Sequence, residues 1–271
     1  MTTTDMQGLD NQASDSLYFE VQGSGRPVLL IPGTPGDGGQ FDELAEILAE
    51  GHLVITYDRA GTSRSGGPAS PTVAEHAHEA AALLRAQASQ GAVVFGTSNG
   101  GAVALELALS HPSLIERVIV HEVPLLSVLA DPRPVADMLT AMINADMERG
   151  GPVAALEAFL RFAFGDEVVA GWPADLRERI LANADMVFSV EFPAFQAYRP
   201  DEAALRSSRV PIVVAVGVDQ QAPFFMEAAT WLAERAGVDV TRVPGAHGPQ
   251  FTCPAAFAEA VFGVTEEPGV G

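Results

Sequence analysis

The residues best suited to chemistry in this chain are a serine and a histidine that follow short apolar runs. Ser98 lies in Gly96-Thr97-Ser98-Asn99-Gly100, directly after Ala92-Val93-Val94-Phe95 and before the helix-like stretch 101–110. A strand, a sharp turn with small residues, and a helix are typical of a nucleophile elbow, in which a strained backbone presents the hydroxyl. We therefore predict that Ser98 is a nucleophile, with a plain glycine-rich turn as the alternative.

Ser98 needs a base, because a serine hydroxyl is a weak nucleophile at neutral pH. His247 follows the strand-like run Val240–Val243, in the loop Pro244-Gly245-Ala246-His247-Gly248. An imidazole in such a loop can take the serine proton and return it to a leaving group. We predict that His247 is this base, against the simpler interpretation of a histidine in a turn.

The developing oxyanion needs N–H donors, and two places in the sequence offer them. One is Asn99, the residue after the nucleophile. The other is the loop Pro32-Gly33-Thr34-Pro35-Gly36, which follows the apolar run Val28–Ile31. Because proline has no N–H, the donors of this loop are Gly33, Thr34 and Gly36. We predict Thr34 as the second donor, although a simple turn would also account for the composition.

These residues are placed by short aliphatic runs that alternate with longer alanine-rich helical patterns, which predicts a mostly parallel sheet with helices on both faces. A run over residues 17–21, followed by Gly23-Ser24-Gly25, predicts an antiparallel first strand. The other expected strands cover residues 28–31, 53–57, 92–95, 117–120, 212–216 and 238–243. The expected helices between them cover residues 41–49, 73–89, 99–110, 224–236 and 254–262.

The alternation stops between Pro124 and Arg209, where helical patterns follow one another without a strand. Expected helices cover residues 135–149, 153–164, 174–182 and 185–197, with prolines and glycines between them. We predict a core of residues 17–123 and 210–271, a helical cap over 124–209, and a flexible tail over 1–16. Most methionines and aromatic residues of the cap are expected to pack it onto the core, and a minority to line a cavity.

The composition of the chain limits the classes of partner that it can bind. The 271 residues are 48% hydrophobic and 18% charged, as in a globular protein, and the net charge of −20 disfavours nucleic acid and anionic lipid. A single cysteine provides no disulfide framework or zinc cluster, and no apolar run approaches the roughly 18 residues of a membrane span. We expect a cytoplasmic protein with a small-molecule substrate and no cofactor or metal, and leave a homo-oligomer open.

Taken together, the motifs resemble those of the α/β-hydrolase superfamily, in its capped group, and the resemblance covers nearly everything after Ser16. It depends on the loop 32–36, the segment Tyr57-Asp58-Arg59-Ala60-Gly61-Thr62-Ser63-Arg64-Ser65, the elbow and the histidine loop. It implies an α/β-hydrolase fold with a triad of serine, histidine and acid. Within the second segment, Asp58 and Arg59 resemble a structural motif.

The chain departs from the family pattern at two positions. The histidine that usually begins the loop is Pro32 here, which removes a side chain that supports the loop. Ser98 stands where epoxide hydrolases and dehalogenases have aspartate, which disfavours their alkyl-enzyme chemistry.

The acid has two candidates. Most of the superfamily carries it in a G-x-x-D pattern after the strand that follows the cap, but Gly217-Val218-Asp219-Gln220 has its aspartate one residue early. Some relatives carry it after the strand that follows the elbow helix, and Glu122 lies there. We favour Glu122 and keep Asp219 as the alternative.

The resemblance therefore implies a serine hydrolase that acts on a small, largely apolar ester, lactone or thioester. The same parts would serve a C–C bond hydrolase, a lyase or a cyclase, since a triad does not set the reaction class. A non-catalytic, ligand-binding protein of this fold is a further alternative, which Pro32 and the displaced aspartate motivate.

Overall fold

The computed structural model describes residues 2–3 and 17–263, which contain an eight-stranded sheet in the order β1-β2-β4-β3-β5-β6-β7-β8. β2 lies antiparallel to its neighbours, and all pairs from β4 to β8 are parallel. The predicted α/β-hydrolase fold is confirmed. The strands are β1 Thr2–Thr3, β2 Phe19–Gly23, β3 Arg26–Ile31, β4 His52–Tyr57, β5 Ala92–Thr97, β6 Ile115–His121, β7 Ile212–Gly217 and β8 Val240–Val243.

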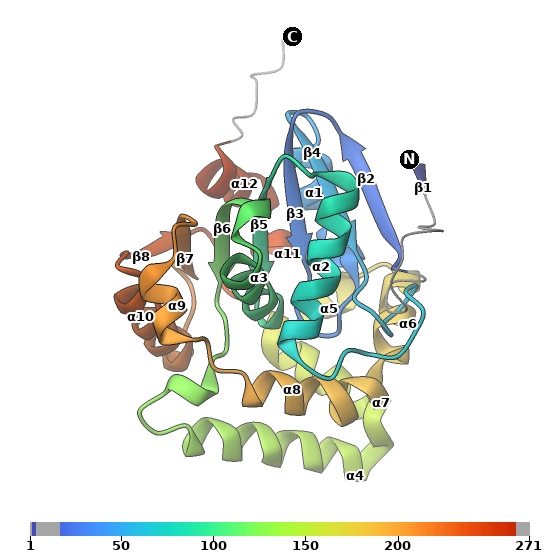
Figure 1. The fold of residues 1–271 in the computed structure, drawn as a ribbon. Coiled ribbons are helices and arrows are strands. Elements are labelled where there is room, and N and C mark those ends of the chain that lie inside the picture. The colour runs from blue at the N-terminus through green and yellow to red at the C-terminus, as the bar shows by residue number, and fades with distance from the viewer. Residues whose placement is uncertain (1, 4–16, 264–271) are drawn as a thin grey trace.

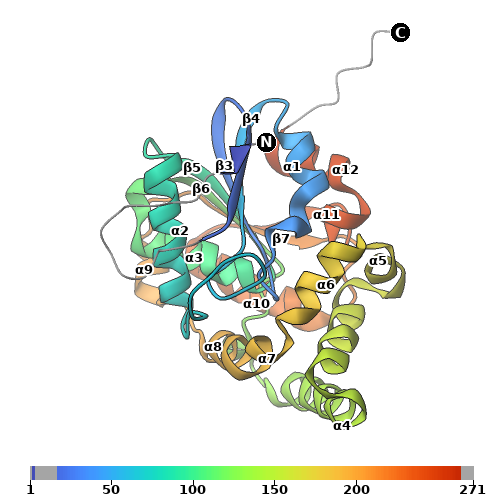
Figure 2. The ribbon, with the colours of Figure 1, turned by 90° about the vertical axis from the view of Figure 1, so that its right-hand side faces the viewer.

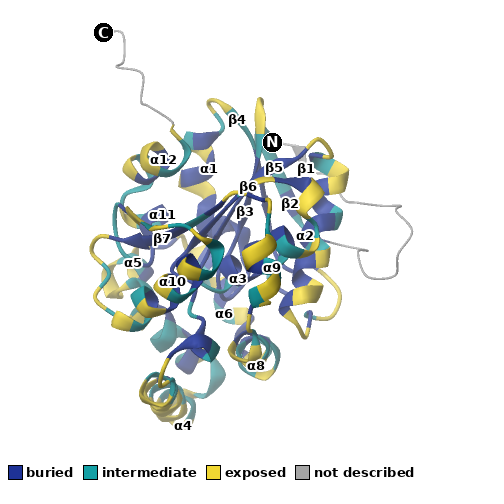
Figure 3. Ribbon diagram, turned by 60° about the vertical axis from the view of Figure 1, so that its left-hand side comes forward, coloured by how far each residue is buried: buried dark blue, intermediate teal, exposed yellow. Residues whose placement is uncertain are grey.

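Helices cover both faces of this sheet, as Figure 2 shows from its edge. α1 (Asp42–Leu48) and α12 (Pro254–Phe262) pack on one face, and α2 (Val73–Gln87), α3 (Asn99–Ser110) and α10 (Pro223–Ala236) pack on the other. Successive side chains of a strand point to opposite faces, so Val93 and Phe95 of β5 join the first layer and Val94 the second. The dark strands inside paler helices in Figure 3 reflect this two-sided burial.

A helical segment lies between β6 and β7 and crosses one end of the sheet, at the bottom of Figure 1. We call α4 to α8, with the π turn between α7 and α8, the cap helices. They are α4 Arg133–Phe164, α5 Asp166–Gly171, α6 Ala174–Ala182, α7 Ala184–Met186, the π turn Val187–Glu191 and α8 Phe192–Ala197. Many of their apolar residues, including Leu156, Trp172 and Ile180, form a separate buried cluster.

The cap helices differ from the prediction at one point. The expected break between helices 135–149 and 153–164 is present, because α4 is kinked where Gly150 and Gly151 leave helical geometry, Gly151 with φ of 74°. Pro152 then begins the second half, because a proline is tolerated in a first turn but not in a helix interior. The helix expected over 185–197 is divided by the π turn.

Short elements escaped the sequence analysis. α5 has six residues, α9 (Glu202–Ser207) six and α11 (Pro249–Thr252) four, so none is long enough to show a helical period. The single-turn η1 Gly38–Phe41, η2 Pro112–Leu114 and η3 Leu126–Val128 escaped for the same reason.

The N-terminal prediction needs one correction. Thr2–Thr3 do not belong to a flexible tail, because they form β1 and pair with Val21 and Glu20 of β2. The unpaired edge of β2 offers backbone groups that can bind such an added strand. The rest of the predicted tail, residues 1 and 4–16, lies outside the described residues.

None of the helices in the described part of the chain has the length and apolar character that crossing a membrane requires.

Candidate active site

Ser98 occupies a sharp turn between β5 and α3. Its backbone has φ of 53° and ψ of −132°, a conformation that L-residues seldom adopt, and its N–H donates to the carbonyl of His121 at 2.9 Å. The neighbouring glycines are required by close approach. A side chain at Gly96 would come within 2.2 Å of the Gly100 carbonyl, and one at Gly100 within 2.3 Å of the Ile31 carbonyl. The local geometry is that of the predicted elbow.

The loop 32–36 packs directly against this turn. A side chain at Gly33 would meet Ser98 Cβ at 3.1 Å, and Asn99 Nδ2 donates to the hydroxyl of Thr34 at 2.8 Å. Asn99 is the first residue of α3, so its backbone N–H has no acceptor within the helix. The structure therefore brings both predicted oxyanion donors, Thr34 and Asn99, beside the serine.

His247 is held by the buried carboxylate of Glu122. Its Nδ1 lies 2.9 Å from Oε2 of Glu122, whose residue is only 1% exposed. Oε1 of the same carboxylate accepts from the Gly217 N–H at 2.9 Å, and Oε2 also accepts from Gln220 Nε2 at 2.6 Å. Glu122 has φ of 46°, so the chain turns sharply as it leaves β6. This network holds the imidazole through Nδ1 and leaves its Nε2 without a hydrogen-bond partner among the described residues.

Asp219, the second candidate acid, is placed differently. The residue is exposed, and its backbone N–H donates to the Gly245 carbonyl at 3.0 Å while its carbonyl accepts from Gln221. Within the described residues its carboxylate makes no hydrogen bond to His247. The structure thus joins Glu122, and not Asp219, to the imidazole.

Charge in this network is set by burial and by hydrogen bonds. Burial alone would raise the pKa of Glu122, but the hydrogen bond from His247, the nearby His121 and the Gln220 amide outweigh it and hold that pKa below its usual value. Glu122 is therefore ionised at neutral pH. Complete burial lowers the pKa of His121 to about 4, against the opposing effect of Glu122, so His121 is neutral.

The imidazole of His247 is also fixed by aromatic contacts. It stacks on Phe225 of α10 with ring centroids 4.7 Å apart, and Phe164 at the end of α4 lies 5.7 Å away. Core and cap thus both restrict the ring.

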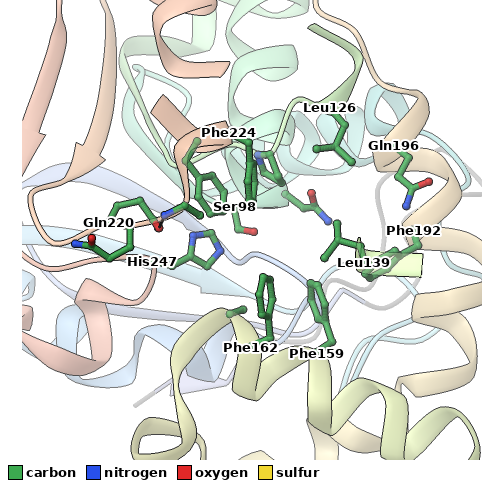
Figure 4. A pocket seen from close by; sticks show the side chains of 16 residues that line it. Ser98, Leu126, Leu139, Phe159, Phe162, Phe192, Gln196, Gln220, Phe224 and His247 are labelled. Carbon is green, nitrogen blue, oxygen red and sulfur yellow. Dashed lines mark hydrogen bonds between the residues drawn. The ribbon is translucent and has the colours of Figure 1, made fainter. Parts of the chain in front are cut away.

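Ser98 and His247 open into one apolar cavity of about 280 Å³, and Figure 4 shows the two side chains close together within it. Ser98 Oγ makes no hydrogen bond to the imidazole in the described structure, and such contacts commonly tighten only when substrate binds. Asn99 also lines the cavity. Its apolar wall includes Leu126, Leu139, Phe159, Phe162, Phe192, Phe224 and Phe225, and its polar groups include Gln196, Gln220 and Gln221.

Gln220 is a site residue that was not predicted from the sequence. It was interpreted only as the amide in place of the expected acid, whereas its side chain donates to Glu122. Its position one place after Asp219 was the available signal. Phe224 and Phe225 were likewise read only as the start of a helix, although both line the cavity.

Comparisons with known proteins agree with the fold. A family model described as "Alpha/beta hydrolase family" matches residues 28–260. The chain is 29% identical over 239 residues to "Uncharacterized hydrolase YraK" of Bacillus subtilis (strain 168), covering 86% of each chain. It is 30% identical over 261 residues to a zearalenone hydrolase of Bionectria ochroleuca, covering 92% of this chain and 94% of the relative. The solved enol-lactonase from Burkholderia xenovorans LB400 shares the fold, with a TM-score of 0.74 at 20% identity over 93% of this chain and 96% of that one.

Proposed function

Because the chain belongs to the alpha/beta hydrolase family, we propose that it hydrolyses a small, largely apolar ester, lactone or thioester through Ser98 and an acyl-enzyme. The observation that carries the proposal is the buried contact of 2.9 Å between His247 Nδ1 and Glu122 Oε2, beside an elbow serine that lines the same cavity as the imidazole. The names of the relatives support hydrolase activity.

The first half of the mechanism is attack by Ser98. Nε2 of His247 takes the hydroxyl proton as Oγ bonds to the substrate carbonyl carbon, and the carbonyl oxygen becomes an oxyanion. The N–H groups of Thr34 and Asn99 stabilise that charge where it develops. Glu122 keeps the proton on Nδ1 and stabilises the imidazolium, which it can do because it stays ionised.

The second half releases the products. The imidazolium gives its proton to the departing alkoxide or thiolate, and the carbonyl bond reforms to leave an acyl ester on Ser98. A water then replaces the leaving group. His247 takes a proton from this water, the acid product forms, and the Ser98 hydroxyl is restored.

The cavity supports the substrate class. At about 280 Å³ with a wall of leucine and phenylalanine, it suits an apolar acyl or alkyl group, while the amides of Gln196, Gln220 and Gln221 offer few polar contacts. The relative named as a zearalenone hydrolase supports hydrolysis, and the solved enol-lactonase shares the fold.

The alternatives raised by the sequence use the same residues. C–C bond hydrolysis would also require Ser98, whereas a lyase or cyclase would not need an acyl-enzyme. The non-catalytic alternative depended on Pro32 and on a displaced acid. It is weakened because Glu122 contacts His247 and because Arg59 donates to the Pro32 carbonyl.

The proposal is tested by measuring hydrolysis of aryl esters, alkyl thioesters and lactones of increasing acyl length. Ser98→Ala and His247→Ala are each expected to lower kcat by at least about 10³-fold, because members of a triad act as a unit. Retained hydrolysis in Ser98→Ala, with the fold intact by circular dichroism, would contradict an acyl-enzyme on Ser98.

A further inference from the structure

A fully buried ion pair joins the cap helices to the core near the candidate active site. Arg59 follows β4, Glu191 ends the π turn, neither side chain is exposed, and Arg59 Nη2 bonds to Glu191 Oε1. The guanidinium also lies over the ring of Phe195, 5.2 Å from its centroid. Burying two charges is costly, and Arg59 Nε and Glu191 Oε2 have no partner in the described structure. Such a pair contributes little net stability, so its role is better sought in the segments that it holds in place.

Arg59 holds the oxyanion loop, residues 32–36, at both ends. Its Nη1 donates to the Pro32 carbonyl at 2.9 Å, and its backbone N–H donates to the Gly36 carbonyl at 2.9 Å. Between these points, Gly33 packs on Ser98 and the Thr34 hydroxyl accepts from Asn99. The position of the loop relative to Ser98 therefore depends on Arg59.

The cap helices reach the same loop at two further points. Asn183, which follows α6, donates from Nδ2 to the Pro35 carbonyl at 3.2 Å. Arg179 of α6 donates from Nε to Asp37, just beyond the loop, at 3.0 Å. The cap helices therefore contact the loop region directly at Pro35 and Asp37, and Glu191 contacts it indirectly, through Arg59, at Pro32.

We propose that Arg59 and Glu191 are positioning residues that place the oxyanion loop over Ser98, so that docking of the cap helices sets the oxyanion geometry. The inference rests on the proposed function. Neither residue lines the cavity, so both act through the loop and not on the substrate. At Pro32, whose side chain has no hydrogen-bonding group, Arg59 of the ion pair supports the loop through the backbone carbonyl.

The test compares Glu191→Gln, Arg59→Met and the double variant Arg59→Met/Glu191→Leu with the wild type. A single change leaves one charge buried without its partner and can unfold the chain. The double variant removes both charges and avoids this cost. Tyr198→Phe is the matched control. Tyr198 OH donates to Glu106 of α3 at 3.0 Å, so this change also removes a contact between the core and the inserted segment, but one that does not touch the loop.

The first readout is kinetic. In the folded variants we expect kcat to fall by about 10- to 100-fold with KM changed by less than about threefold, since a loosened donor acts on the transition state. Affinity for a trifluoromethyl ketone, which forms an oxyanion on the serine, should fall in parallel. Tyr198→Phe should leave both values within about twofold of the wild type.

The second readout does not depend on activity. Hydrogen exchange measured by mass spectrometry should be at least about tenfold faster for peptides covering residues 32–37 in the ion-pair variants, and unchanged in Tyr198→Phe. Wild-type exchange in this loop, or wild-type kcat and ketone affinity, in a folded ion-pair variant would overturn the proposal. A wild-type protein without esterase activity would instead contradict the proposed function, and the exchange data alone would then decide whether the ion pair holds the loop.

Discussion

The loops that follow β6 and β7 each present a carboxylate near the histidine loop, yet only one carboxylate meets the imidazole. Glu122 is buried with three hydrogen bonds to its side chain, whereas Asp219 is exposed and uses its backbone to bind the neighbouring loop. Residue type does not separate the two. The difference lies in backbone conformation, because Glu122 adopts φ of 46° at the end of its strand.

The two loops also cooperate. Gln220, next to Asp219, donates to Glu122 at 2.6 Å, and Gly217 at the end of β7 donates to the other oxygen. The loop after β7 therefore supplies donors to an acid that the loop after β6 carries. This exchange of roles explains how Gln220 can stand near the place where the family pattern led us to expect an acid.

The largest effect should come from neutralising the two carboxylates, Glu122 and Asp219, one at a time. Glu122→Gln is expected to lower kcat by about 10⁴-fold, because the amide no longer enforces the correct tautomer of His247. Asp219→Asn should stay within about twofold of the wild type. Steady-state kinetics on an activated ester measures both. Equal losses in the two variants would erase the distinction between the loops.

The next effect concerns acid stability on the β6 side, where His121 lies behind Glu122. Its pKa of about 4 in the fold, against 6.5 in an unfolded chain, means that the unfolded state binds the extra proton between these values. The stabilisation is thus complete above pH 6.5 and is lost as the pH falls toward 4. The difference corresponds to about 3 kcal/mol, at about 1.36 kcal/mol per pKa unit.

Denaturant unfolding at pH 6.5 and pH 4 tests this, with His121→Gln against the exposed His78→Gln as the control. His121→Gln should lose about 3 kcal/mol less than the wild type over that interval, and His78→Gln should follow the wild type. Identical losses in all three proteins would show that His121 titrates normally.

Moving the acid from one loop to the other should partly reverse the first result. The rescue variant adds Gln220→Glu to Glu122→Gln. In the wild type the Gln220 amide bonds to Oε2 of Glu122, the same oxygen that contacts His247, so a carboxylate at position 220 lies close to the imidazole. We expect about tenfold recovery of kcat. Adding Asp219→Glu instead should recover nothing, since that residue is exposed. Equal recovery from the two positions would mean that the β7 loop is more adaptable than the structure indicates.

The smallest effect should come from Gln220→Met. This change removes one hydrogen bond to the Glu122 carboxylate but leaves those from His247 and Gly217. We expect kcat to fall about fivefold and the pKa of Glu122 to rise, because a hydrogen bond to its charged form is lost. Steady-state kinetics measures the first change, and a carbon NMR titration of the Glu122 carboxylate measures the second. An unchanged pKa of Glu122 would show that Gln220 does not stabilise the charge.

The sequence predicted the elbow, the order of the core elements and the candidate residues, because these are local. Gly96 and Gly100 surround Ser98 in the chain, and α3 and α12 have the bounds that their periodicity indicates. The choice between Glu122 and Asp219 is different in kind. It depends on a positive φ at Glu122 and on two donors, Gly217 at the end of β7 and Gln220 in the loop after it, which lie 95 residues or more from Glu122 in sequence.

The cap helices were predicted less completely. The break at Gly150 and Gly151 is local and was expected, but the π turn before α8 was not, and no spacing rule shows that Glu191 reaches Arg59. The motif that contains Arg59 was interpreted as structural. That interpretation is now refined by the proposal that it positions the oxyanion loop.

The most direct test of the central claim is the reaction of the purified protein with a fluorophosphonate, followed by peptide mass spectrometry. We predict a single phosphonyl adduct on Ser98, lost in Ser98→Ala, greatly slowed in His247→Ala and Glu122→Gln, and unchanged in Asp219→Asn. An unlabelled wild-type protein that is folded by circular dichroism, or an adduct at another residue, would contradict an activated Ser98.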